Sequence, residues 1–240
     1  MLDFVKVVSV PNKKGGYDII PKFIIKRSSD LMIRGGDFYA VWDESKNLWS
    51  VDEQDAIQMI DDQVDRVKSE TEKKYPDAAG SISAKYLWDS NTGSIDKWHR
   101  YCQKQMRDSY HMLDETIIFS NQEVTKESYA SRRLSYPLID GDHSAFDKII
   151  STLYSQEERH KIEWAIGSIV SGDSKTIQKF MVLYGAAGTG KSTILNIIQM
   201  LFEGYYSVFD AKALGSSNNS FALEAFKSNP LVAIQHDGDL

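Results

Sequence analysis

The feature that most constrains the fold is the segment from Phe180 to Thr193, which reads FMVLYGAAGTGKST. An apolar run leads directly into the spacing G-x-x-x-x-G-K-S, and an apolar pattern of helical period follows. This order predicts a strand, a glycine-rich loop and a helix, the arrangement that binds nucleotide phosphates. Backbone N–H groups wrap a phosphate where a strand delivers the chain and a helix N-terminus receives it.

The predicted ligand of this loop is ATP with Mg²⁺. Lys191 is expected to reach the β- and γ-phosphates as a point charge, and the Ser192 hydroxyl to ligate the Mg²⁺. Gly188 and Gly190 allow backbone conformations that a Cβ would hinder close to phosphates. The alternative, a tight glycine turn without a nucleotide, does not account for the apolar flanks. The predicted nucleotide-binding residues are Gly185, Ala186, Ala187, Gly188, Thr189, Gly190, Lys191, Ser192 and Thr193.

A loop of this kind needs an acidic partner that holds the Mg²⁺ through water and positions the attacking water. Leu231 to Gln235 has the length and apolarity of a strand, and Asp237 follows its end. Carboxyl ends of parallel strands present ligand-binding groups, so Asp237 is the predicted catalytic and metal-binding acid. Asp239 is the alternative acid, and a simple Asp-Gly-Asp turn is the structural alternative to both.

The first half of the chain predicts strands followed by helices. Short apolar runs such as Phe4 to Val10, broken by proline and glycine, predict strands, and Trp42 to Trp49 predicts a hairpin. Ser50 and Glu53 have the spacing of a capping box. Apolar residues at helical steps then predict a helix of about 20 residues from Asp52.

A second helix is predicted from Ser94, and each of its faces has two interpretations. Its aromatic residues, Trp98, Tyr101 and Tyr110, are expected in the core rather than as platforms for nucleic-acid bases. Cys102 fits the same apolar face, and as the only cysteine it excludes an internal disulfide. The interleaved basic residues either form a solvated surface, which is the favoured interpretation, or contact phosphates. These are Lys97, Arg100, Lys104 and Arg107.

Composition limits the partners of the chain. Among 240 residues the net charge is −6, which argues against a wholly basic nucleic-acid coat but permits a basic channel formed on assembly. The sequence has neither an apolar window long enough to span a membrane nor a signal-peptide pattern. We therefore expect a soluble, cytoplasmic protein without a membrane partner.

Two motifs together resemble the superfamily 3 helicases of the phage, plasmid and poxvirus primase-helicase type. In that family a helix with Trp and "G…SG", here Ile162 to Gly172, precedes a strand and a phosphate-binding loop, here Lys179 to Thr193. Phe38 to Asp43, with Leu48 and Trp49, resembles the module before the helicase core. The resemblance is strong from Glu158 onward and weak before it.

The resemblance implies a replicative DNA helicase that uses ATP and Mg²⁺. The implied partners are single-stranded or forked DNA, further subunits in a ring, most simply a hexamer with ATP between subunits, and a primase or other replication proteins. It also implies the cytoplasm of the host cell if the chain is encoded by a phage. A primase site is not predicted within residues 1–150, because clustered acids with a histidine are not seen there.

The expected fold class is an α/β P-loop NTPase, AAA+-like and incomplete, preceded by a mostly helical α+β N-terminal module. Residues 1–35 are expected to form short strands without an assigned role, and residues 36–143 the N-terminal helicase-associated module, ending in a linker from Ser135 to His143. Residues 144–240 are expected to form a helical lead-in and a truncated NTPase core.

The incomplete core follows from the short stretch after Gly185, which leaves little chain to cover both faces of a parallel sheet. No arginine follows Arg159, so the arginine finger and the polar sensor are expected beyond Leu240, and the fragment alone is expected to hydrolyse ATP weakly or not at all. Two alternatives stay open. One is a viral DNA-packaging ATPase, and the other is a nucleotide-dependent replication assembly module that unwinds nothing.

Overall fold

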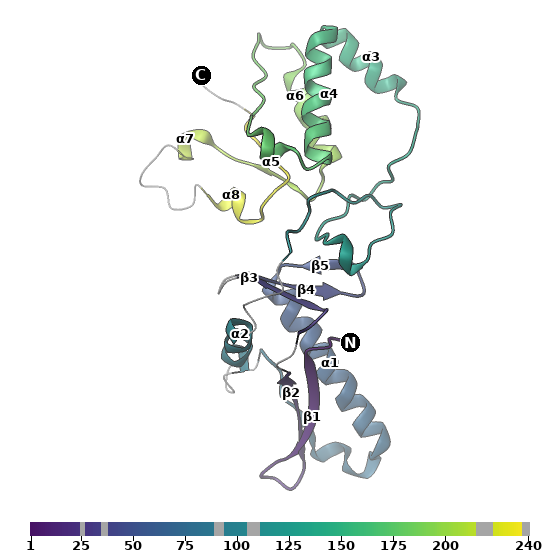
Figure 1. The fold of residues 1–240 in the computed structure, drawn as a ribbon, viewed down its shortest axis with the longest axis vertical. Coiled ribbons are helices and arrows are strands. Elements are labelled where there is room, and N and C mark those ends of the chain that lie inside the picture. Colours follow the sequence, from purple (N-terminus) through teal and green to yellow (C-terminus); the bar gives the residue numbers. More distant parts are fainter. Residues whose placement is uncertain (25–26, 35–37, 89–93, 105–110, 215–222, 237–240) are drawn as a thin grey trace. The chain divides into compact units, whose positions relative to one another are not determined.

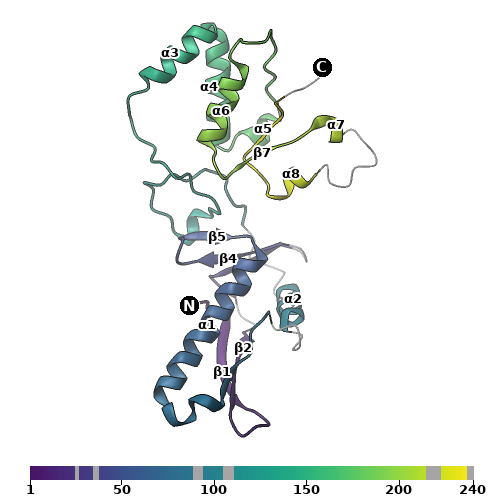
Figure 2. The same cartoon turned by 180° about the vertical axis from the view of Figure 1, so that it is seen from behind.

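The structure is a computed structural model that describes residues 1–24, 27–34, 38–88, 94–104, 111–214 and 223–236. The chain divides into two compact units (Figures 1 and 2). Unit 1 comprises residues 1–114 and 123–132, and unit 2 comprises residues 115–122 and 133–240. Residues 1–35, which the sequence predicted as a separate stretch, therefore belong to the same unit as residues 36–114, and the expected module at 36–143 is shared between the units.

Unit 1 is built in its described part from two small sheets, two α-helices and two short 3-10 helices, labelled η1 and η2. The first sheet has the order β1-β2-β6, in which β1 and β2 are antiparallel and β6 joins β2 in parallel. The second is the antiparallel meander β3-β4-β5. The elements are β1 Val5–Pro11, β2 Tyr17–Phe23, β3 Leu31–Arg34, β4 Phe38–Asp43, β5 Leu48–Ser50, α1 Glu53–Lys74, η1 Pro76–Ser81, β6 Ile82–Ala84, α2 Ser94–Lys104 and η2 Lys126–Ser128. Within residues 36–143, the range expected to be mostly helical, the helices α1, α2, η1 and η2 contain more residues than the strands β4, β5 and β6, and the strands β1, β2 and β3 lie in residues 1–35.

The predicted hairpin and first long helix are confirmed. Trp42 of β4 pairs with Trp49 of β5 across the antiparallel ladder, and their rings meet edge to face. Helix α1 follows, but its N-cap is Asp52, whose side chain accepts a hydrogen bond from the Gln54 N–H. The predicted capping box with Ser50 is therefore wrong. The physical reason is that Ser50 still belongs to β5, where its hydroxyl donates to Asp55.

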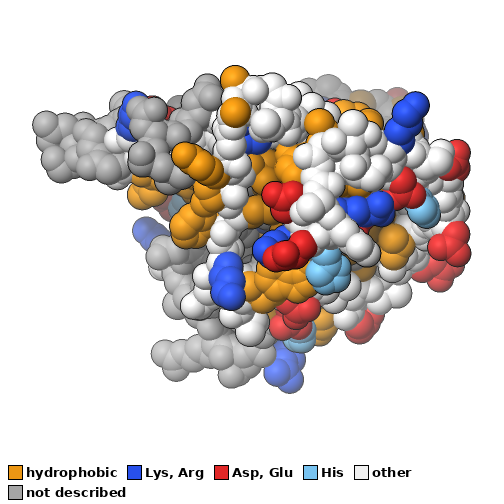
Figure 3. Space-filling model, turned by 90° about the horizontal axis from the view of Figure 1, so that it is seen from above, with side chains coloured by type: hydrophobic (Ala, Val, Ile, Leu, Met, Phe, Trp, Pro, Cys, Tyr) orange, Lys and Arg blue, Asp and Glu red, His pale blue; other side chains and the backbone are white. Residues whose placement is uncertain are grey.

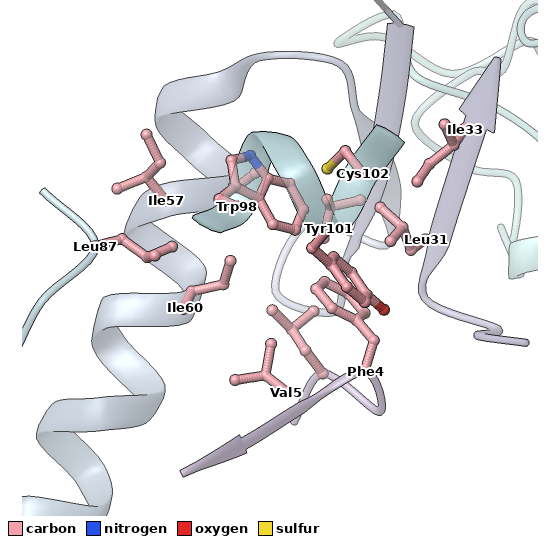
Figure 4. Packing of buried hydrophobic residues seen from close by; sticks show 13 residues of the cluster. Phe4, Val5, Leu31, Ile33, Ile57, Ile60, Leu87, Trp98, Tyr101 and Cys102 are labelled. Carbon is pink, nitrogen blue, oxygen red and sulfur yellow. The ribbon is translucent and has the colours of Figure 1, made fainter. Parts of the chain in front are cut away.

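Helix α2 carries the aromatic face that fills the core of unit 1 (Figure 4). Trp98 has no exposed surface, and its ring packs against Phe4 and Phe23 and, edge-on, against Tyr39. Tyr101 is also buried and donates a hydrogen bond from its hydroxyl to the Ile24 carbonyl oxygen at 3.0 Å. The prediction that Trp98 and Tyr101 belong to the core is confirmed, whereas Tyr110 and Arg107 lie outside the described residues.

Cys102 should be chemically inert in the folded chain. It is buried on α2, and burial raises the pKa of its thiol to about 12, so almost none is thiolate at pH 8. We expect a disulfide reagent such as DTNB to label it at least about a hundredfold more slowly in buffer than in denaturant. Equal rates in the two solvents would show that α2 is not docked as described.

Unit 2 places helices around one small parallel sheet. Its elements are α3 Ser144–Leu153, α4 Gln156–Val170, α5 Ser174–Ile177, α6 Lys191–Leu201, β7 Tyr206–Val208, α7 Ala211–Leu214, α8 Glu224–Lys227 and β8 Val232–Ile234. Strands β7 and β8 run parallel, with Tyr206 opposite Val232 and Val208 opposite Ile234. The chain is therefore of mixed α/β type with small sheets.

The helices expected in this unit are present, and one core holds them together. Ser155 and Glu158 form a reciprocal capping box at the start of α4. Buried residues of α3, α4, α6 and β8 form one hydrophobic cluster with residues from 117–134. From these four elements it contains Ile150, Ile162, Ile194, Ile198 and Ile234.

The strand predicted before the glycine-rich loop is absent: residues 178–186 have neither helical nor strand structure. Phe180 and Tyr184 are 88% and 89% exposed, and of this run Leu183 joins the core of unit 2. A strand forms when a neighbouring strand supplies hydrogen-bonding partners, and within the described residues neither β7 nor β8 pairs with this run. Figure 3 shows exposed hydrophobic side chains among charged ones on the face of the molecule seen from above.

Every helix within the described ranges is too short or too polar to cross a lipid bilayer. The expected cytoplasmic location stays a prediction.

Candidate nucleotide-binding site

The glycine-rich loop is held by the helix that follows it. Helix α6 begins at Lys191 and buries Ile194, Ile198 and the following Phe202 in the core of unit 2. These side chains recur at steps of four, so one face of the helix is fixed in the core while its N-terminus meets solvent. The site therefore has a rigid side, α6, and an exposed side, the loop from Gly185 to Thr189.

Glycine is required in the loop by its backbone angles. Gly188 and Gly190 have φ of 79° and 83°, the left-handed region that disfavours side chains, and Gly190 is the N-cap of α6. Residues in the left-handed conformation that alternate with residues in the right-handed conformation point successive backbone N–H groups into one concave surface. Such a surface binds anions. Gly190 also lies close to α3, since a Cβ there would approach the Leu153 Cδ1 to 2.5 Å.

The backbone N–H groups from Gly185 to Thr193 donate no hydrogen bond within the described part of the chain. The first N–H groups of a helix lack intrahelical acceptors and carry the positive end of the helix dipole. Such groups are satisfied by water or by an anion. This loop and the first turn of α6 thus present a continuous set of donors on an exposed surface.

The Lys191 ammonium folds back over this set of donors. Its Nζ donates to the carbonyl oxygens of Gly185 and Ala186 at 2.8 and 2.6 Å, and lies 3.3 Å from the Thr189 hydroxyl. The Thr189 hydroxyl itself donates to the Ala186 carbonyl at 2.9 Å. These contacts close the loop around the Lys191 ammonium. The sequence motif did not predict them. Phosphate oxygens are stronger acceptors for an ammonium than neutral carbonyls.

The remaining predicted loop residues are exposed on either side of Gly190 and Lys191. Ser192 and Thr193 are exposed in the first turn of α6, directly after Lys191. Ala186 and Ala187 are exposed in the loop, and their methyl groups leave it open. A hydroxyl at Ser192 is a hard oxygen ligand of the kind that Mg²⁺ prefers.

Strand β8 lies beside the C-terminal end of α6. Leu231, just before β8, donates from its N–H to the Tyr205 carbonyl oxygen beyond the end of α6. His236, just after β8, accepts a hydrogen bond at its Nε2 from the Gln199 amide within α6. The two predicted acids, Asp237 and Asp239, lie outside the described residues.

Comparison of the chain with protein-family models, with curated proteins and with solved structures found no match.

Gly190→Ala should weaken unit 2, because an L-residue at this φ costs roughly 1–2 kcal/mol of unfolding free energy. Gly167 is a matched control: it lies inside α4, and a Cβ there meets nothing within 4 Å. Gly167→Ala should raise stability by about 0.4–1 kcal/mol. Urea unfolding of both variants measures the difference, and equal effects would show that the loop conformation is not the one described.

Proposed function

We propose that the chain is the ATP-binding part of a DNA-unwinding motor of the superfamily 3 helicase type. The observation that carries the proposal is the row of unused N–H donors from Gly185 to Thr193, closed by the Lys191 ammonium. A triphosphate provides the acceptors that these donors lack. Its negative charge also suits the N-terminal end of the α6 dipole.

In the proposed complex each group has a separate task. The loop amides hold the phosphates, and Lys191 exchanges its carbonyl acceptors for phosphate oxygens. The Ser192 hydroxyl would hold Mg²⁺, which screens the phosphate charge when bound. Asp237, or Asp239 in its place, would hold the ion through water and orient the attacking water.

The parallel pair β7–β8 also supports the proposal. Nucleotide sites in α/β folds lie at the carboxyl ends of parallel strands, and β8 lies beside the C-terminal end of α6. The exposed apolar run from Phe180 to Tyr184 is the expected strand of the same sheet, and we propose that it pairs in the assembled protein. The choice of DNA as the partner rests on the resemblance of Ile162–Gly172 and Lys179–Thr193 to that helicase family.

The test begins with nucleotide binding. We expect the chain to bind a fluorescent ATP analogue with Mg²⁺, measured by titration, and AMP much more weakly because AMP lacks the β- and γ-phosphates. Absence of binding would overturn the proposal. In the full protein, turnover should rise with single-stranded DNA, and a labelled strand should be displaced from a fork.

The alternatives give different results in the same assays. A packaging ATPase would be stimulated by duplex DNA and would displace no strand. An assembly module would bind ATP and change its oligomeric state without DNA-stimulated turnover. Either result would contradict the proposal of a DNA-unwinding motor but would agree with the proposed nucleotide site.

A further inference from the structure

Unit 1 contains a groove of about 580 Å³ that the glycine-rich loop does not explain. Its floor is apolar, and includes the buried Leu87 and Tyr101 and the half-buried Phe23. Five of its ten lining residues are cationic, and none is acidic. The cations are Lys22, Lys85, Lys97, Arg100 and Lys104.

The cations come from separate parts of the chain that the fold brings together. Lys22 lies on β2, and Lys85 follows β6, which pairs with β2 in parallel. Lys97, Arg100 and Lys104 recur at steps of three and four along α2, so they share one face of that helix. The sequence predicted the basic face of α2. It did not predict that Lys22 and Lys85 line the opposite side of the same groove.

Within the described residues, none of these five cations forms an ion pair with a carboxylate. The charge of Lys85 contributes to the lowered pKa of Asp18, although the hydrogen bond from Ser83 to that carboxylate is the larger cause. The α2 cations are exposed, as is Lys22. Like charges around an apolar floor repel one another, and a polyanion removes that repulsion.

We propose that this groove binds single-stranded DNA, with the cations on phosphates and the apolar floor against bases. Cationic grooves with aromatic surfaces bind single strands because unpaired bases can pack on them, whereas duplex bases are already stacked. The partly exposed ring of Phe23, stacked on Tyr101 with centroids 4.9 Å apart, supplies such a surface.

This inference rests on the proposed function and deepens it, because it names a surface for the DNA partner, but binding at the groove needs no nucleotide. The groove gives a chain with a net charge of −6 a defined cationic surface for that partner. A chain that did not bind DNA at the groove could still bind ATP at the glycine-rich loop. A chain that did not bind ATP could still bind DNA at the groove.

The test measures fluorescence anisotropy of labelled oligo(dT) with the full chain, without nucleotide. The groove variant combines Lys97→Ala, Arg100→Ala and Lys104→Ala. We expect its affinity to fall by about tenfold or more and its slope of log affinity against log salt to shrink by about 2. The control variant removes the same charge from exposed lysines outside the groove, at Lys13, Lys14 and Lys73, and should lose less than about twofold.

A second variant tests the opposite wall without touching α2. Lys22→Ala with Lys85→Ala should weaken oligo(dT) binding several-fold, so a folding defect in α2 cannot imitate the result. Equal losses in the groove and control variants would overturn the proposal, as would an unchanged affinity in both groove variants. Equal affinity for duplex DNA would overturn single-strand binding. Displacement by poly-glutamate as effective as by unlabelled oligo(dT) would indicate an acidic protein partner instead.

Discussion

The Lys191→Ala chain should bind ATP with Mg²⁺ at least about tenfold, and up to about a hundredfold, more weakly than the unaltered chain. A hydrogen bond between charged groups contributes roughly 1.5–3 kcal/mol, which corresponds to that range. The present acceptors of the ammonium are backbone carbonyls of an exposed loop, so its loss should change the unfolding free energy little. Titration calorimetry and urea unfolding of the same sample measure both quantities.

Lys161→Ala is the matched control for this prediction. Lys161 lies on α4 in the same unit, and its side chain is 67% exposed and paired with the exposed Glu157. Surface ion pairs of this kind contribute little, so the control should keep the nucleotide affinity. Equal losses in the two variants would mean that Lys191 acts through net charge alone. An unchanged affinity in Lys191→Ala would remove the lysine from the site.

Local patterns predicted much of unit 2 correctly. The apolar pattern that predicted a helix after the glycine-rich loop corresponds to the steps of four in Ile194, Ile198 and Phe202, and such steps depend on residues within a turn or two of the helix. The strand at Phe180 to Tyr184 failed because strand pairing depends on a distant segment that the local sequence does not contain. Whether residues 180–184 form a strand therefore depends on the segments that lie next to them and not on their own composition.

The same reasoning explains what local patterns missed in unit 1. The spacing of Lys97, Arg100 and Lys104 predicts a basic helix face, and such a face is usually solvated. The interpretation changes because the parallel pairing of β6 with β2 sets Lys22 and Lys85 along the same groove. That pairing joins distant residues, for example Asp18 with Ser83, and no local motif encodes it. The Lys191 contacts to its own loop were missed because they depend on side-chain placement.

Trp98→Ala should be the most destabilising single substitution tested in unit 1. Trp98 is fully buried between Phe4, Phe23 and Tyr39, and removing such a side chain costs about 3–5 kcal/mol. The unfolding transition of unit 1 should fall by roughly 10–20 °C by scanning calorimetry. Trp88→Ala removes the same side chain from an exposed position and should change stability by less than about 0.5 kcal/mol.

This prediction also links the core to the groove. Trp98 holds α2 against the sheet, and the same helix carries three of the five groove cations. Loss of the indole should therefore weaken oligo(dT) binding even though Trp98 has no exposed surface to contact DNA. Trp98→Phe, which keeps an aromatic ring in the cluster, should retain most of the binding. If Trp98→Ala unfolded α2 while oligo(dT) affinity stayed the same, DNA would have to bind elsewhere on the chain.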